Sequence, residues 1–410
     1  MSNKIAKDDT LKELVDATRT IAEAIDPSAV ARRYGFRRKK AESNSSARIE
    51  YLYDAVNMTP AHMDFTNGVF VWGDWEEFVN KIARPVMLKL DGTVDYELAH
   101  HDQTKKIDGT ASDLTNTEYN GNAMVEFKNY KWVKRYEDAT YEYVIFSNKK
   151  LDNGYHAYAH TDASGQVADA FYYGMYASQK IGTALRSFGA NNSSVSQTAE
   201  SEITQSKANG NGYNIHDYMK WSYILDLLVL IGKSDNLQAI YGTGRSKSTS
   251  TAQIANGTLK DKGCFFGDNG EENAVKVFWI ENLWGNIWQR VHGLICDNGT
   301  YKTRAHAPFC DTPVSAADYS AYRNTGITAP AGGYVKDAYC SDVDAFLPKT
   351  VGGTSSTYFC DYFYINATAL TFSRVGGAWA TGGGCGRSVY LDNGASYASS
   401  NLGSRLSYTP

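Results

Sequence analysis

The sequence predicts a β-rich α+β fold. Short segments that mix β-branched and aromatic residues recur between residue 49 and about residue 188, and again in the last third of the chain. Asp-Gly and Asn-Gly pairs separate several of these segments, and such pairs are typical of tight turns between antiparallel strands. Two other segments have the apolar spacing of an amphipathic helix. A chain of 410 residues, 42% of them hydrophobic, is long enough for about two or three domains with real cores.

The strand predictions rest on runs of β-branched and aromatic residues. Between residues 49 and 188 these runs lie at 69–72, 86–90, 124–127 and 141–146. Turns are expected at Asp91-Gly92, Asp108-Gly109, Asn120-Gly121 and Asn153-Gly154. Further short strands are predicted at 275–279 and 357–364.

The two predicted helices differ in character. The first begins at Thr10, where Thr10 to Glu13 has the form of a capping box, and it ends at Asp26-Pro27. It is short, so we expect it to pack on its own domain or on symmetry mates. The second covers residues 216–231, and we expect its Trp221 and Leu228 in a core.

We predict three regions along the chain. Residues 1–48 hold the first helix and a basic linker, residues 49–204 a small β-rich body, and residues 205–410 a C-terminal domain. The linker is predicted from six cationic residues that are not followed by interleaved aromatic residues: Arg32, Arg33, Arg37, Arg38, Lys39 and Lys40. Residues 190–214 are rich in Ser, Asn and Gln, which predicts an interdomain linker or a long loop, and residues 242–258 predict a second loop.

The bulk composition excludes some partners. The net charge is −4, from 41 basic and 45 acidic residues, so no global field draws the chain to nucleic acid or to anionic lipid. The longest apolar run, at 224–231, is too short to span a membrane, and the first nine residues lack the apolar core of a signal peptide. Tyrosine is frequent, at 29 residues, which suits both binding loops and β-strands.

The six cysteines all lie in the C-terminal part of the chain, and none is spaced as Cys-x-x-Cys. A zinc ribbon is therefore not expected. Disulfides of an extracellular domain and buried thiols remain as interpretations. The second is favoured, because cysteine is among the most buried residue types.

The end of the chain contains a framed segment with a restricted alphabet. One side of the frame is Arg374-Val-Gly-Gly-Ala-Trp379, and the other is Gly403-Ser-Arg405-Leu-Ser-Tyr408. From Ala380 onward the chain contains no Lys, Glu, Gln, Met or Trp, although the rest of the sequence uses them all. A rigid frame around such a segment suggests a displayed surface, because loops tolerate change when the packing lies elsewhere.

This frame resembles the end of the formylglycine-generating-enzyme-like branch of the C-type lectin fold. A second block, Trp279-Ile-Glu-Asn-Leu-Trp284-Gly-Asn286-Ile-Trp288, resembles the "GNVWEW" block of that branch, and it precedes the "RGGSW…GFR"-like ending in the same order. Val375, Ala378 and Ser404 are the departures from that ending. The resemblance implies a C-type-lectin-like domain at 205–410, in which Trp279, Trp284, Trp288, Trp379 and Arg405 build the frame and Asn286 caps or cross-links the backbone.

Within that branch the chain is most similar to the variable proteins of diversity-generating retroelements. In those proteins, mutagenesis of an AAC-type codon reaches most side chains except the five types missing here. The resemblance implies a receptor-binding protein at the tail tip of a phage or prophage, assembled in the bacterial cytoplasm, homotrimeric, and bound to other tail proteins. Residues 49–204 would serve virion attachment and oligomerisation.

The resemblance also implies a variable segment at 380–401 that binds a host cell-surface protein or glycan. The exchangeable residues that we expect on the ligand are Ala380, Thr381, Gly383, Gly384, Arg387, Ser388, Tyr390, Asp392, Tyr397 and Ser399. Tyr390, Arg387 and Tyr397 are expected to be exposed and to anchor the ligand, since Tyr and Arg are typical hot-spot residues.

Two other functions stay open: an enzyme, of the formylglycine-generating type or a glycan-processing tail protein, and a purely structural tail subunit. Copper-dependent cysteine oxidation needs two thiolates, whereas this ending offers Cys385 alone, with Thr381 at the position expected for the other. Cys385 is then either a variable residue or a buried one. We predict no enzymatic activity and no cofactor. A calcium site at Asp268-Asn-Gly-Glu271-Glu272-Asn273 is the weaker alternative to a turn there.

Overall fold

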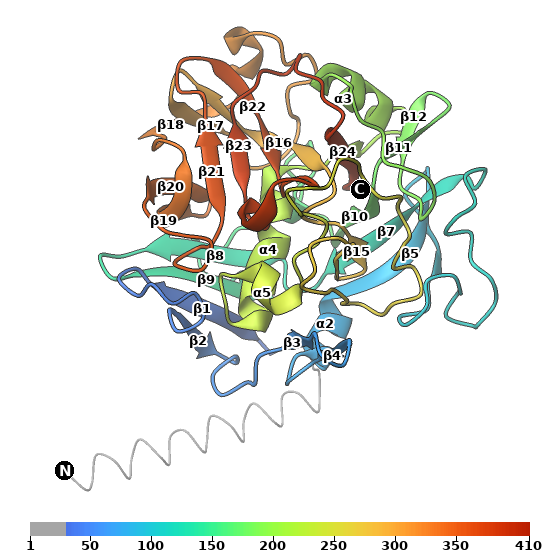
Figure 1. The fold of residues 1–410 in the computed structure, drawn as a ribbon, viewed down its shortest axis with the longest axis horizontal. Coiled ribbons are helices and arrows are strands. Elements are labelled where there is room, and N and C mark those ends of the chain that lie inside the picture. The colour runs from blue at the N-terminus through green and yellow to red at the C-terminus, as the bar shows by residue number, and fades with distance from the viewer. Residues whose placement is uncertain (1–29) are drawn as a thin grey trace, which may run out of the picture.

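The structure, a computed structural model that describes residues 30–410, is built around a sheet of 14 strands and a separate sheet of four strands (Figure 1). The helix predicted between Thr10 and Asp26 lies outside the described residues. Helices are few, so the β-rich α+β class predicted from the sequence is confirmed.

The large sheet holds the C-terminal part of the chain together with earlier strands. Its order is β20-β19-β21-β23-β22-β16-β24-β10-β7-β5-β6, with β13 beside β24 and with β17 between β16 and β18. The pairs β16–β24 and β21–β23 are parallel. The strands are β5 (Ala83–Lys89), β6 (Val94–Glu97), β7 (Gly121–Lys128), β10 (Ala170–Ala177), β13 (Tyr213–Ile215), β16 (Trp288–Asp297), β17 (Thr300–Thr303), β18 (Arg323–Thr328), β19 (Gly333–Ser341), β20 (Ala345–Val351), β21 (Tyr362–Ile365), β22 (Leu370–Val375), β23 (Val389–Leu391) and β24 (Leu402–Tyr408).

The four-stranded sheet has the order β2-β1-β9-β8, with all neighbours antiparallel. Its strands are β1 (Arg33–Lys39), β2 (Ile49–Tyr53), β8 (Trp132–Glu137) and β9 (Tyr141–Ser147). The prediction of a basic linker is therefore wrong for this stretch. Phe36 and Arg38 point inward and are buried, while Arg37 and Lys39 alternate with them toward solvent. The alternation of buried and exposed residues in β1 cannot be recognised from the sequence, because one of the inward-facing residues is an arginine.

Three hairpins and several helices complete the described chain. The hairpins pair β3 (His62–Asp64) with β4 (Val69–Val71), β11 (Gln179–Ile181) with β12 (Ala184–Arg186), and β14 (Lys276–Val277) with β15 (Ile280–Glu281). The helices are α2 (Glu76–Ile82), α3 (Ala199–Lys207), α4 (Tyr218–Gly232) and α5 (Leu237–Tyr241), and the 3-10 turns are η2 (Tyr158–His160), η3 (Ala316–Tyr319) and η4 (Gly382–Gly384).

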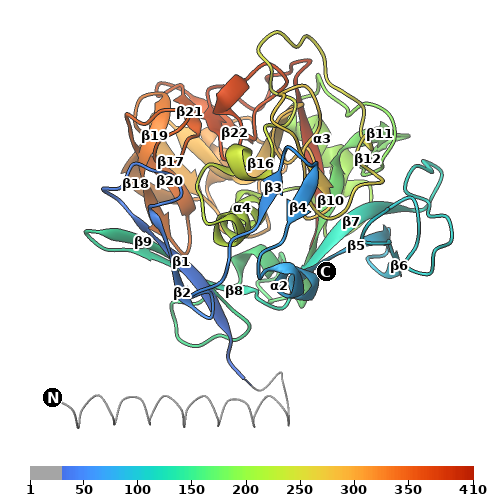
Figure 2. The same cartoon turned by 60° about the horizontal axis from the view of Figure 1, so that its bottom comes forward.

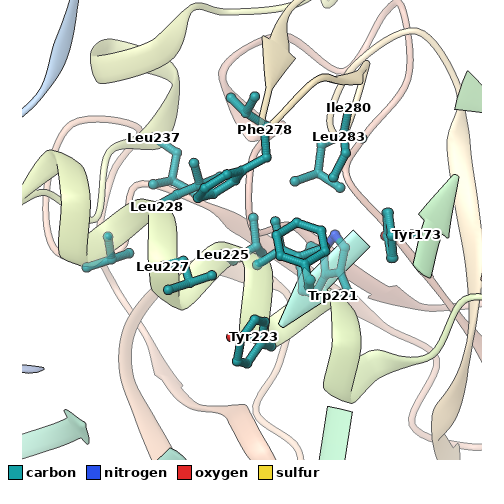
Figure 3. Packing of buried hydrophobic residues seen from close by; sticks show 14 of the residues in the cluster. Tyr173, Trp221, Tyr223, Leu225, Leu227, Leu228, Leu237, Phe278, Ile280 and Leu283 are labelled. Atoms are coloured by element: carbon teal, nitrogen blue, oxygen red, sulfur yellow. The ribbon is translucent and has the colours of Figure 1, made fainter. Parts of the chain in front are cut away.

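Helix α4 forms the centre of the core, close to its predicted bounds. The Asp217 carboxylate caps it by accepting a hydrogen bond of 2.9 Å from the Lys220 amide. All of its residues are buried, as expected for a helix that is apolar on most faces and enclosed by other elements. Figure 3 shows Trp221 and Leu228 packed among side chains from the segment that carries Phe278. The expectation that Trp221 and Leu228 are core residues is confirmed.

The strand predictions are largely confirmed by β4, β5, β7 and β9. The strand predicted at 275–279 is shorter, because Phe278 and Trp279 adopt positive φ angles of 49° and 59° that break the extended chain. The polar stretch 190–214 contains α3 and the beginning of β13. The predicted boundary between residues 204 and 205 falls within α3, and the large sheet continues across it, since β24 pairs with β10.

All six cysteines are free thiols, and five of them are buried, with Cys310 half-buried. The interpretation as buried thiols is confirmed for five of the six cysteines. Among residues 30–410, no helix is long and apolar enough to cross a membrane.

Candidate ligand-binding surface

The Trp-rich block is buried and leads into β16 of the large sheet, which begins at Trp288. Trp279, Trp284 and Trp288 are all buried, as predicted. Asn286 holds the block to a distant loop through both ends of its amide. Its Oδ1 accepts a hydrogen bond of 2.8 Å from the Ile254 amide, and its Nδ2 donates one of 3.0 Å to the Ile254 carbonyl. The predicted cross-linking role of Asn286 is confirmed, and it satisfies a buried amide as such a site requires.

The first side of the frame follows β22, which pairs with β16 of the Trp-rich block. Gly376 and Gly377 then turn the chain with φ angles of 87° and 82°. A Cβ at Gly377 would lie 2.4 Å from the Cys385 sulfur, so a larger residue would not fit there. Trp379 is buried against Ala177 and Ile287. Trp379 therefore meets the Trp-rich block at Ile287, while Trp288 packs in a neighbouring cluster with Ala378 and Leu402.

The other side of the frame is fixed by Arg405 on β24. This side chain is fully buried and donates hydrogen bonds to the Gln289 side chain and to the carbonyls of Gly174, Glu281 and Asn282, all at 2.8–2.9 Å. Burial lowers the pKa of Arg405 to about 10. The predicted frame role of Arg405 is confirmed, and the hydrogen bonds explain why a charge is tolerated there.

Between the two sides, β23 brings a row of large polar side chains together. It lies between β21 and β22, and Tyr390 faces Tyr364 on one neighbour and Arg374 on the other. The rings of Tyr390 and Tyr364 are 5.6 Å apart, and the Arg374 guanidinium lies 5.2 Å from the Tyr390 ring. The Trp288 ring of the buried frame lies below, 4.3 Å from Tyr390. A rigid sheet therefore presents this row.

The loop after β23 adds two further side chains. Asp392 accepts two hydrogen bonds from the Arg374 guanidinium, at 2.6 and 3.1 Å, and Tyr397 lies 5.9 Å from the same group. Tyr364 is 46% exposed and Tyr397 is 38% exposed. We name the set Tyr362, Tyr364, Arg374, Tyr390, Asp392 and Tyr397 the tyrosine surface; Arg374 is its buried member.

Part of the tyrosine surface was missed from the sequence. Tyr362 lies 6.1 Å from Tyr390 and 5.1 Å from Tyr334, so the aromatic row continues away from the variable segment. Tyr362 and Tyr364 sit in an alternating aromatic run that was interpreted only as a strand. Arg374 was assigned to the frame, although its guanidinium contacts Tyr390, Asp392 and Tyr397. Only the strand order β21-β23-β22 brings these residues together.

Arg387 and Ser388 do not lie on this surface, and the expectation that Arg387 is exposed is wrong. Both are buried, and the Arg387 side chain is only 3% exposed. Its guanidinium forms an ion pair of 2.7 Å with Asp226 of helix α4, and its amide donates a hydrogen bond of 2.9 Å to Asp361. Arg387 is buried because it pairs with a buried carboxylate on α4, and no pattern in the sequence indicates that these two positions are in contact.

Asp226 is the centre of a buried charge cluster. Arg387, Arg135 and Arg38 approach its carboxylate at 2.7, 2.9 and 3.7 Å. Burial by itself would raise the pKa of Asp226, but the three guanidinium groups outweigh it and hold the pKa below its ordinary value. The cluster ties the four-stranded sheet, α4 and the segment 380–401 together, so position 387 belongs to the scaffold.

The remaining predicted residues lie in the loops at the two ends of the segment. Ala380 is exposed, and Thr381 accepts a hydrogen bond of 2.8 Å from the Ala378 amide. Gly383 lies in η4, and Gly384, in the same turn, is buried. Ser399 is half-buried and donates a hydrogen bond of 2.8 Å to Asn401.

Cys385 and Asp268 are the residues on which the two alternative sites, for copper and for calcium, would depend. Cys385 is fully buried beneath Gly377, and burial raises its pKa, which disfavours the thiolate that copper binding needs. Asp268 accepts hydrogen bonds of 2.8 Å from the Gly270 amide and from Asn273, in the manner of a turn. Within the described part of the chain, no group of three or more potential metal-ligating side chains is found.

The chain matches no protein-family model and no curated protein. Comparison with solved structures finds chains described as Major Tropism Determinant M1 Variant and Major Tropism Determinant I1 Variant. The TM-scores are 0.30 and 0.29, the identities are 11% and 10%, and each match covers 80% of this chain and 72% of the other. These values describe a distant likeness.

Proposed function

We propose that the protein is a receptor-binding protein of a phage or prophage tail, and that it binds a molecule of the host cell surface without chemistry. The observation that carries the proposal is the pair of Tyr364 and Tyr390, held on β21 and β23 beside the buried Arg374 and above the buried Trp288. Tyrosine offers a large contact area at a low entropic cost, and it is enriched among interface hot spots. A rigid sheet below them reduces the ordering cost of binding.

The proposal includes sequence diversification in residues 380–401. Replacement by other amino acids is supported best at positions that are exposed or half-buried, namely Ala380, Tyr390, Asp392, Tyr397 and Ser399. Arg387 and Ser388 are excluded, because their side chains are buried in the scaffold. The corresponding genomic test is simple: a near-identical repeat and a reverse-transcriptase gene beside this gene support diversification, and their absence contradicts it.

We further propose that the protein acts as a homotrimer at the tail tip, attached to other tail proteins. The proposal rests on the resemblance of the two sequence blocks to the variable proteins of diversity-generating retroelements. Light scattering on the purified full chain measures the oligomeric state, and a monomer at micromolar concentration contradicts this part of the proposal.

The binding function is tested with labelled full-length protein on a panel of bacterial strains, read by flow cytometry. The expected result is saturable binding to some strains, which the Tyr364→Ala and Tyr397→Ala variants lose. Loss of a hot-spot aromatic residue costs about 2 kcal/mol or more, which is roughly a 30-fold weaker affinity. Tyr136→Ala is the matched control, since Tyr136 is also 38% exposed but lies on the four-stranded sheet. Equal loss in the control, or no binding to any strain, contradicts the proposal.

A further inference from the structure

A pocket distinct from the tyrosine surface lies between the β3–β4 hairpin, helix α2 and residues 261–266. Its volume is about 350 Å³, which is in the range of small-ligand sites. None of its lining residues belongs to the segment 380–401. Figure 2 shows β3 and β4 with α2 below them, and β3 contacts α5. The function proposed above makes no use of this pocket.

The inner wall of the pocket is aromatic and rigid. The ring of Phe70 stacks on that of Phe265 at 4.4 Å, and Trp72 stands edge-on to Phe70 at 4.9 Å. At the back, the buried Trp279 is held in place by its indole Nε1, which donates a hydrogen bond of 2.9 Å to the His100 carbonyl. Phe70 and Trp72 are only partly buried, so their rings remain accessible from the pocket.

The mouth of the pocket carries exposed polar side chains. Glu76, Asn80, His101 and Asp261 line it and are exposed. Within residues 30–410, these four side chains form no hydrogen bond and no ion pair with any other residue. Lys262 adds a cation, which lies 5.1 Å from the Phe266 ring. The mouth therefore offers free acceptors and free donors around an aromatic wall.

We propose that this pocket binds carbohydrate, as a short segment of one or two pyranose rings. A pyranose presents an apolar C–H face that packs on aromatic rings, and hydroxyl groups that both donate and accept hydrogen bonds. The wall of Phe70 and Trp72 matches the face, while Glu76, Asn80 and Asp261 match the hydroxyl groups.

Other ligand chemistries fit the pocket less well. A purely apolar ligand would leave the polar groups of the mouth dehydrated and unpaired, which costs free energy. An anion would meet the carboxylates of Glu76 and Asp261. A quaternary ammonium ion suits aromatic walls and is attracted by both carboxylates, but it can neither donate nor accept the hydrogen bonds that Asn80 and Lys262 offer. A neutral sugar avoids each of these costs.

The experiment is a fluorescence titration of the full-length protein, because Trp72 and Trp279 line the pocket and report on its contents. The probes are glucose, galactose, mannose, N-acetylglucosamine, rhamnose, lactose and chitobiose. The expected result is a saturable signal with at least one sugar, at a dissociation constant in the millimolar range. Glu76→Gln and Asp261→Asn should each weaken binding by about 10-fold, the upper range for one hydrogen bond.

The matched control is Glu77→Gln, since Glu77 lies next to Glu76 on α2, is exposed and pairs with Lys81 outside the pocket. It should leave sugar binding unchanged, as should Tyr397→Ala. The proposal is overturned if no sugar gives a saturable signal, if Glu76→Gln and Asp261→Asn bind as tightly as the unchanged protein, or if tetramethylammonium competes with the sugar. Loss of sugar binding in Tyr397→Ala alone also overturns it and assigns the sugar to the tyrosine surface.

Discussion

Replacement of Arg387 by alanine tests whether the middle of the segment 380–401 is scaffold or binding surface. The ion pair between Arg387 and Asp226 measures 2.7 Å, and at an effective dielectric constant of about 20 its gross attraction is about 6 kcal/mol. The net cost of removal is smaller, because desolvation of the arginine is also relieved. Breaking a buried pair typically costs about 3–5 kcal/mol.

The surroundings of Arg387 favour the lower end of that range. Asp226 keeps the guanidinium groups of Arg135 and Arg38 after the change, so its charge stays compensated. The variant also loses the contact between the guanidinium and the Phe346 ring, at 5.1 Å. We therefore expect Arg387→Ala to lower the free energy of unfolding by about 3 kcal/mol.

The measurement is a urea titration followed by tryptophan fluorescence, with Arg37→Ala as the matched control. Arg37 also pairs with a carboxylate, Glu50, but both side chains are about one-third exposed. Its removal should cost less than about 1 kcal/mol, as for surface ion pairs. If Arg387→Ala is no more destabilising than Arg37→Ala and instead abolishes cell binding, Arg387 is a binding residue and the scaffold argument fails.

Three further predictions concern the frame, the buried histidine and the cysteines. Trp379→Ala should lower the free energy of unfolding by about 3–5 kcal/mol, whereas Tyr397→Ala should change it by no more than about 0.5 kcal/mol; the reverse order in the same titration would mean that frame and surface are exchanged. Burial lowers the pKa of His160 to about 3 from 6.5, so the unfolded chain takes up a proton that the folded protein does not, and stability falls as the pH falls below about 6.5. From pH 7 to pH 4.5 the free energy of unfolding of His160→Phe should therefore fall by about 2–3 kcal/mol less than that of the unchanged protein. Urea titration at both pH values measures this difference, and an equal fall in the two proteins would refute the lowered pKa of His160. Iodoacetamide should label the half-buried Cys310 of the native protein first and the buried Cys385 only after unfolding, as followed by peptide mass spectrometry; early labelling of Cys385 would contradict its burial.

The sequence by itself determined the features that depend on local pattern. The apolar period predicted α4, and β-branched runs with Asp-Gly and Asn-Gly turns predicted β4, β5, β7 and β9. The Trp-rich block and the Gly-Gly turn predicted the frame, because large aromatic rings and glycines of positive φ are constrained wherever they occur. Those signals lie within a few neighbouring residues and can therefore be recognised without knowledge of the fold.

Tertiary structure alone decided which polar residues face solvent. Arg38 and Arg387 are cations that charge patterns assign to a surface, yet both are buried. Each has a carboxylate partner far away in the sequence: Asp235 at 2.8 Å from Arg38, and Asp226 on α4 at 2.7 Å from Arg387. Tyr364 joins Tyr390 only because β23 is inserted beside β21 in parallel. Whether a charged side chain is buried, and which residues a tyrosine contacts, depend on pairing between segments that are far apart in the sequence. A local pattern does not say which distant strand or helix provides the partner.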